Sequence, residues 1–200
     1  MFGLILKDLK NVAGQAIYYL AILAILYVVA FLTKNVYFYA GAVVFFSISV
    51  PVSAIAYDEK DGWDAFALAA GMRRRDLVLS RYLLCLFVAL FLFLLSVAFC
   101  AVEEMRTQET LAVFLAYGGI TFLVSDFLLP FVLKVGTEKA RAAFTVMIVC
   151  VLALGGGVAV LTQSLPGGAL LASCILLALG VFGGVVSYYV ALRLYSANVF

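Results

Sequence analysis

The sequence predicts an all-α membrane protein with six transmembrane helices in a single domain. Hydrophobic residues make up 67% of the chain, charged residues 12%, and the mean hydropathy is +1.20, which excludes a soluble globular domain. The apolar runs are continuous rather than alternating, which favours helices over a β-barrel, because a helix satisfies its own backbone hydrogen bonds in lipid. Six of these runs reach about 20 residues, the length that crosses a hydrocarbon core about 30 Å thick.

The predicted spans follow one another along one transmembrane domain, residues 1–200. They are residues 14–32, 36–57, 83–102, 111–133, 142–161 and 168–192. If the N-terminus is cytoplasmic, all of the 13 Lys and Arg residues except Lys34 and Arg106 fall on the cytoplasmic side. The positive-inside rule therefore predicts that both termini are cytoplasmic.

The segment ahead of the first span, Met1–Val12, predicts a short amphipathic helix. Lys7, Asp8 and Lys10 lie on one side of it, and an apolar face on the other consists of Phe2, Ile5, Leu6, Leu9 and Val12. Such a helix is expected to lie along the inner membrane surface. The alternative is a solvated tail that leads into the first span.

The connection at residues 58–82 predicts a short cytoplasmic helix from Trp63 to Ala70, with Asp61 as its N-cap and Gly71 in the left-handed conformation after its end. The helix includes Asp64, and its spacing is expected to put four residues on one face: Trp63, Phe66, Ala67 and Ala70. Since a helix of two turns is not stable alone, it must pack on the bilayer interface or in a groove of a cytoplasmic protein.

A basic cluster follows this helix and leads into the third span: Arg73, Arg74, Arg75 and Arg81. The order of second span, acidic segment, short aromatic helix, turn, Arg-rich stretch and basic residue resembles the permease subunits of type-2 ATP-binding-cassette (ABC) exporters. A second similarity, to the linker of a small bacterial branch of that family, follows the fourth span at residues 129–141. It rests on Pro130, Lys134, Gly136, Lys139 and Arg141.

The resemblance implies that Met1–Val12 is an elbow helix and that Trp63–Ala70 is a coupling helix, which docks on a nucleotide-binding ATPase subunit. It also implies a second permease subunit, identical or different, in the bacterial plasma membrane. The branch points to export of a hydrophobic or amphipathic peptide, toxin or drug. ATP and Mg²⁺ would belong to the ATPase, because this chain has no G-x-x-x-x-G-K-[ST] phosphate loop.

We therefore expect a permease subunit without catalytic residues, metal or cofactor of its own. The absence of histidine removes the commonest general base and metal ligand. An intramembrane protease is disfavoured because its candidate pair, Glu103 and Glu104, lies in an outer loop. The net charge of +2, from dispersed residues, disfavours nucleic-acid binding. A carrier that does not use ATP, or a membrane scaffold, remains the alternative function.

Two features lie inside predicted spans. Asp126 is the only charged residue well inside a predicted span, where a charge at the bilayer centre costs at least ~2.5 kcal/mol. Pro130, four residues later, has no N–H to donate to the Asp126 carbonyl. Asp126 either belongs to a translocation path or proton site, or pairs with Lys134, Arg141 or a Ser or Tyr of a neighbouring helix. Gly180 and Gly184 form a G-x-x-x-G motif, which suits close helix packing within the subunit or across a dimer.

Overall fold

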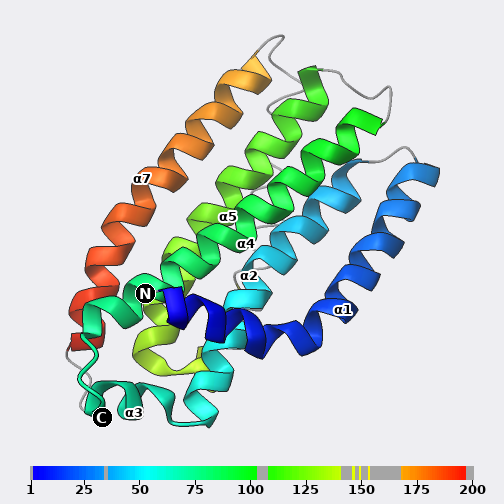
Figure 1. Cartoon of the computed structure of the whole chain (residues 1–200). Coiled ribbons are helices and arrows are strands. Elements are labelled where there is room, and N and C mark those ends of the chain that lie inside the picture. Colours follow the sequence, from blue (N-terminus) through cyan, green and yellow to red (C-terminus); the bar gives the residue numbers. More distant parts are fainter. Residues whose placement is uncertain are drawn as a thin grey trace.

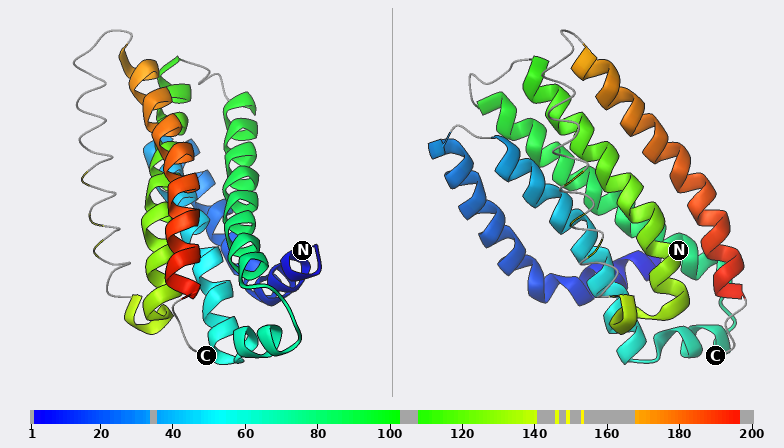
Figure 2. Two further views of the ribbon diagram at one scale, coloured as in Figure 1. Left: turned by 90° about the vertical axis from the view of Figure 1, so that its left-hand side faces the viewer. Right: turned by 180° about the vertical axis from the view of Figure 1, so that it is seen from behind.

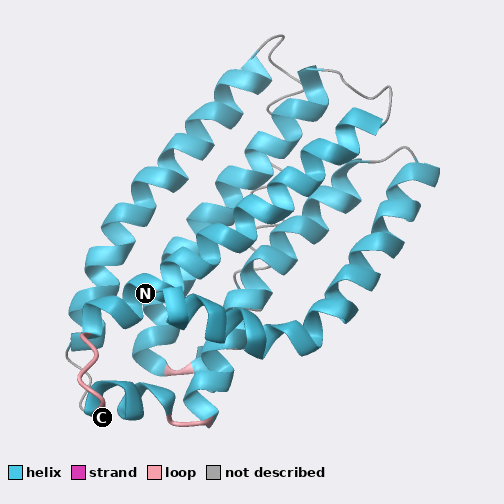
Figure 3. Cartoon of the chain, in the orientation of Figure 1, coloured by secondary structure: helices cyan, strands magenta, loops and turns pink. Residues whose placement is uncertain are grey.

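The computed structural model describes residues 2–33, 36–102, 108–140 and 168–196, together with residues 146, 149 and 153. Its principal elements are helices (Figures 1 and 3), and no strand occurs in these ranges. They are α1 (Phe2–Thr33), α2 (Val36–Lys60), α3 (Trp63–Ala69), α4 (Arg74–Val102), α5 (Gln108–Val135) and α7 (Gly168–Ser196). The predicted all-α class is therefore confirmed for this part of the chain.

Four described helices are long and apolar enough to cross a membrane: Tyr39–Lys60, Arg74–Ser96, Thr110–Val135 and Leu170–Tyr195. They correspond to the second, third, fourth and sixth predicted spans. The first predicted span contains a shorter apolar stretch, Ile17–Thr33. The fifth, residues 142–161, lies almost entirely outside the described residues. Six spans and the orientation of the termini thus remain predictions.

Helix α1 is continuous from Phe2 to Thr33, without an interruption after Val12. It changes direction by a bend instead. Figure 1 shows its dark-blue first part crossing the bundle, while the rest of α1 runs alongside α2. The amphipathic segment is therefore the first part of a longer helix and not a separate one.

The long helices pack around α2, which contacts α1, α4 and α5, while α5 and α7 pack along each other (Figures 1 and 2). Buried residues of α2, such as Tyr39 and Ile55, belong to the two largest core clusters. Of the apolar stretch of α7 that could span a membrane, 17% is buried within the protein, against 56% for the corresponding stretch of α2. Most of α7 therefore presents apolar side chains outward, as expected for a helix that faces lipid.

Helix α3 lies at one end of the bundle, where α2, α5 and α7 end and α4 begins; we call this the α3 end (Figure 1). Helix α4 starts at Arg74, well ahead of the predicted span start at Leu83. The earlier start is possible because two arginines of the added turns have partners within the protein, as described below.

Candidate functional site

The candidate site is the α3 end, and α3 itself is closed by a glycine on each side. Gly62 is the N-cap, with φ 63° and no side-chain cap bond, so the prediction of Asp61 as N-cap is wrong. The backbone N–H of Asp61 donates to the carbonyl of Tyr57 at 3.0 Å, which makes Asp61 part of the last turn of the preceding helix. Asp61 thus lies one residue too early to cap α3.

The end of α3 follows the prediction. Gly71 has φ 85°, and its N–H donates to the Leu68 carbonyl at 3.1 Å. The N–H of Met72 donates to the Ala67 carbonyl at 3.0 Å. These two bonds form a Schellman motif, in which a left-handed glycine satisfies carbonyls that the helix leaves open. A short helix therefore keeps defined ends.

One face of α3 is packed against the protein. Ala67 is 0% exposed and forms an apolar cluster with Leu4 of α1 and Leu77 of α4, while Trp63 and Leu68 pack against it. The first part of α1 thus lies directly on α3. This packing supplies the tertiary contacts that a helix of seven residues needs in order to exist.

Buried ion pairs fix the same elements to one another. Lys7 of α1 lies 2.5 Å from Asp58 of α2 and 3.0 Å from Asp8. Nη2 of Arg81, on α4, lies 2.5 Å from Asp64 of α3 and 3.7 Å from Asp58. We call Lys7, Asp8, Asp58, Asp64 and Arg81 the ion-pair network. Since it spans α1, α2, α3 and α4, none of them shifts alone without separating charges in a largely dehydrated region.

Aromatic rings border this network. The Lys7 ammonium lies 4.4 Å from the centre of the Trp63 ring, and the Arg81 guanidinium lies 5.9 Å from the centre of the Tyr195 ring. Such positions over an aromatic face are favourable for a cation. Trp63 therefore contributes to the interior of the α3 end.

The predicted docking face of α3 is consequently divided. Trp63 is half-buried, Ala67 is buried, and Asp64 is held by Arg81, whereas Phe66 is 64% exposed and Ala70 is also exposed. The four residues that the spacing places on one face therefore do not all remain free for a partner, because the bundle itself covers part of that face. Phe66 is the large apolar side chain that α3 leaves free for another surface.

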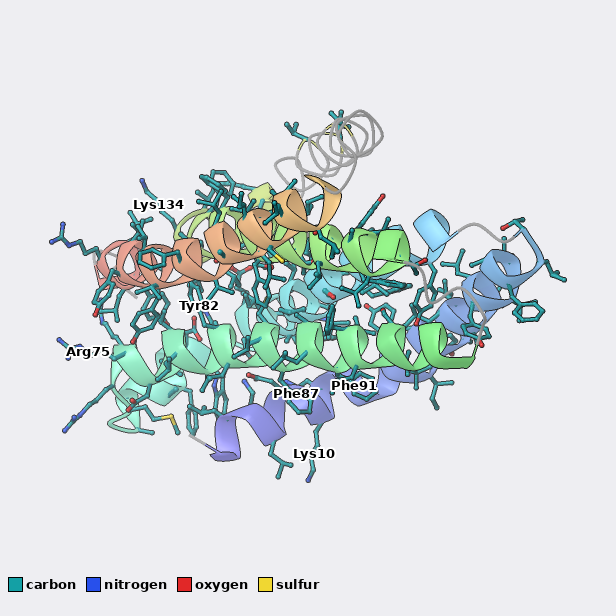
Figure 4. All side chains as sticks on the ribbon, turned by 90° about the horizontal axis from the view of Figure 1, so that it is seen from above. Lys10, Arg75, Tyr82, Phe87, Phe91 and Lys134 are labelled. Carbon is teal, nitrogen blue, oxygen red and sulfur yellow. The ribbon has the colours of Figure 1, made fainter. Side chains whose placement is uncertain are left out.

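The predicted basic cluster is divided in the same way. Arg73 and Arg75 are exposed (Figure 4 labels Arg75), but Arg74 donates from Nη1 to the Tyr195 carbonyl at 3.2 Å. Arg81 is 4% exposed and belongs to the ion-pair network. Two of the four arginines therefore join α4 to α3 and α7, and two project outward.

The linker after α5 has a defined structure at the same end. Gly136 has φ 88° and ends α5, and the Glu59 carboxylate accepts bonds from the Thr137 backbone N–H, at 2.8 and 3.1 Å, and from the Thr137 hydroxyl. A carboxylate at the start of a helical turn is well placed to bind its free N–H groups. Glu59 therefore ties the end of α2 to the segment that follows α5. Lys134, in the last turn of α5, and Lys139, in that segment, are both exposed.

A side chain of α7 bonds the backbone carbonyl that Pro130 leaves open at Asp126. Because Pro130 has no N–H, the Asp126 carbonyl lacks its helical partner, and the Ser187 hydroxyl donates to that carbonyl at 2.5 Å. The Tyr82 hydroxyl lies 2.6 Å from the Ser187 hydroxyl (Figure 4 shows Tyr82 between α4 and α7). A serine thus bonds the backbone of Asp126 rather than its carboxylate. Asp126 Oδ2 is buried and has no hydrogen-bond partner among the described residues.

Glycines allow α5 and α7 to approach closely. A Cβ at Gly180 would lie 2.7 Å from the Cβ of Phe122, and a Cβ at Gly184 would lie 3.3 Å from an Asp126 carboxylate oxygen. On α5, a Cβ at Gly119 would lie 2.7 Å from the backbone of α7. The glycine motif therefore packs within the subunit, and Gly119, which sequence analysis missed, faces it.

A bundle of apolar helices with a short, ion-paired helix at one end defines a multi-pass membrane protein. The chain belongs to the ABC-2 family of transporter proteins, since the model of the ABC-2 family transporter protein matches residues 3–196. This family membership confirms the predicted permease class and implies association with an ATPase subunit. Comparison with curated proteins and with solved structures finds no match.

Proposed function

We propose that the chain is the transmembrane subunit of an ATP-driven exporter in the bacterial plasma membrane. It moves a hydrophobic or amphipathic substrate out of the cell, with ATP and Mg²⁺ bound by a separate nucleotide-binding subunit. The observation that carries the proposal is the family match, which extends over nearly the whole chain. A second permease subunit, identical or related, completes the transporter. The distribution of Lys and Arg supports a cytoplasmic α3 end.

In this proposal α3 is the coupling helix, and Phe66 is its principal contact with the ATPase. An aromatic side chain that is 64% exposed, on a short helix anchored from behind, suits insertion into a groove of a partner. The first part of α1 is the elbow helix, with Leu6 exposed and Lys7 paired with Asp58. The ion-pair network then links the coupling helix to the spans.

The test is co-purification with the ATPase from detergent-solubilised membranes. Phe66→Asp is expected to lose the ATPase while the chain still inserts, because a carboxylate would have to be dehydrated in an apolar groove. Met72→Asp is the matched control, since Met72 is exposed beyond the end of α3. Both variants should reach the membrane in equal amounts.

The outcomes separate the parts of the proposal. Retention of the ATPase by Phe66→Asp would contradict docking through α3 and leave the bilayer interface as the surface for Phe66. If the wild-type chain brings down no ATPase and transport proceeds without ATP, the exporter proposal fails and a carrier is favoured. Transport of an amphipathic substrate into inverted vesicles, dependent on ATP, is the expected positive result.

A further inference from the structure

A crevice of about 340 Å³ opens between α4 and α7, in the half of the bundle farther from α3. Its rim consists of exposed aliphatic side chains, Leu86 and Leu90 on α4 and Val181 on α7. Its inner wall comes from α2 and α5 and includes the buried ring of Phe114. All four helices are candidate membrane spans, so the crevice lies at the depth of the bilayer hydrocarbon.

Tyr82 closes the crevice toward the α3 end. Its hydroxyl contacts Ser187, and its ring lies 5.6 Å from the ring of Tyr188, so α4 and α7 touch at this level. Tyr82, Leu86 and Leu90 are spaced by four residues and therefore share one face of α4. Beyond Tyr82 that face continues with the aliphatic side chains of Leu86 and Leu90, which line the crevice. The crevice begins there, one turn past the contact.

The lining has little to offer a polar ligand. Among the residues that the structure describes, no charged side chain contributes to it, and two of its hydroxyls are already used within their own helices. Ser96 donates to the Leu92 carbonyl at 2.9 Å, and Thr121 donates to the Tyr117 carbonyl at 2.8 Å. A third hydroxyl of the lining, that of Ser47, is buried without a partner among the described residues. A charged head group would find no counter-charge in the crevice, whereas a hydrocarbon chain has no charge to dehydrate.

The volume restricts the ligand further. Ligand pockets measure about 300–1,000 Å³, and this crevice lies at the low end of that range. A narrow apolar space suits one flexible chain better than a fused ring system or a folded peptide. We propose that the crevice binds the aliphatic chain of the exported amphiphile, which enters sideways from the bilayer while its polar head stays outside the crevice. This substrate assignment rests on the proposed function, but binding itself needs no ATPase.

Binding is measured in lipid nanodiscs by fluorescence quenching with a brominated single-chain fatty acid. Trp63 is the only tryptophan, so Trp63→Phe gives a silent background. Phe93→Trp then reports from the crevice wall, and Phe182→Trp reports from the lipid-facing side of α7, where Phe182 is 77% exposed. Quenching at position 93 should saturate at a low mole fraction of the fatty acid. Quenching at position 182 should rise in proportion to it.

Filling the crevice provides the matched pair of variants. Ala89→Leu adds a side chain inside the crevice, whereas Ala178→Leu makes the same change on the exposed side of α7. Ala89→Leu should weaken binding at least about tenfold, because the added side chain occupies the space that the aliphatic chain would enter and overpacks the crevice. Proportional quenching at position 93, or equal effects of the two variants, would overturn the site.

Transport then tests the substrate assignment with Trp63 intact and the ATPase present. Ala89→Leu should lower ATP-driven export of the same fatty acid at least about tenfold at subsaturating concentration, in line with its binding loss, and Ala178→Leu should not. Normal export by Ala89→Leu, together with lost binding, would show that the crevice is off the transport path and overturn the assignment. Failure of the wild-type chain to export with ATP would count against the proposed function, while the quenching result would still decide the site.

Discussion

Removal of Arg81 is predicted to destabilise the α3 end more than removal of any exposed arginine. The side chain of Arg81 is 5% exposed, and its Nη2 lies 2.5 Å from Asp64 and 3.7 Å from Asp58. In Arg81→Met the carboxylate of Asp58 keeps Lys7 at 2.5 Å, but Asp64 loses the cation that faces it. A partly buried carboxylate without its counter-charge is the source of the predicted loss.

The magnitude follows from the burial of the group left behind. Breaking a buried ion pair from one side costs about 3–5 kcal/mol. The Asp64 side chain is 13% exposed and can regain some water, so we expect the lower end, about 3 kcal/mol. A chain of 150–250 residues loses about 2–4 °C of its unfolding midpoint per kcal/mol, so the midpoint should fall by about 6–12 °C.

The assay is thermal unfolding of the purified chain in one fixed detergent. Arg75→Met is the control, because Arg75 is exposed and its loss should stay within about 0.5 kcal/mol. Arg81→Met combined with Asp64→Leu should be more stable than Arg81→Met alone, since no charge is left unpaired. If Arg81→Met matches Arg75→Met, or if the double variant loses the sum of both single changes, the reasoning is refuted.

Three further predictions concern the contact of α5 with α7, all measured as unfolding midpoints. Ser187→Ala should lower the free energy of unfolding by about 1–3 kcal/mol, because it leaves the Asp126 carbonyl without a donor. This loss should be smaller in a Pro130→Ala background, where an N–H is restored. An unchanged loss would contradict the account. Gly119→Ala should destabilise, because its Cβ would lie 2.7 Å from the backbone of α7, whereas Gly41→Ala has open space and should stabilise by about 0.5–1 kcal/mol. Equal effects at the two glycines would refute the close approach. Asp126→Asn should raise the midpoint, because an amide is cheaper to bury than a carboxylate, and a lower midpoint would reveal a charged partner.

Hydropathy predicted the long helices well, because membrane crossing depends on the length and composition of a segment and not on its neighbours. The end of α3 was also predictable, since a left-handed residue after the helix calls for glycine at position 71. Which residues of α3 remain exposed was not predictable from the sequence. Spacing places Ala67 and Phe66 on the same face of a helix, but only the packing of Leu4 and Leu77 decides which of them is buried.

The ion-pair network was missed for a related reason. Arg81 follows a basic run in the sequence, and its residue type alone does not distinguish it from Arg75. Its partners, Asp58 and Asp64, come from two other helices. The available signal was that Arg81 lies next to a span, where a charge needs a partner. The same holds for Ser187. Pro130 predicts that the Asp126 carbonyl lacks its helical donor, but it does not indicate which helix supplies the hydroxyl.

Helix α4 connects the two regions to which we assign function. Arg81 and Tyr82 are adjacent in sequence, and they face different neighbours: Arg81 holds Asp64 of α3, while Tyr82 contacts Ser187 of α7. A displacement of α3 must therefore either break the Arg81–Asp64 pair or carry the first turns of α4 with it. The pair is short and its side chains are largely buried, so carrying α4 is the less costly alternative. Since Leu86 and Leu90 continue the face of Tyr82 and line the crevice, we expect such a movement to change the width of the crevice.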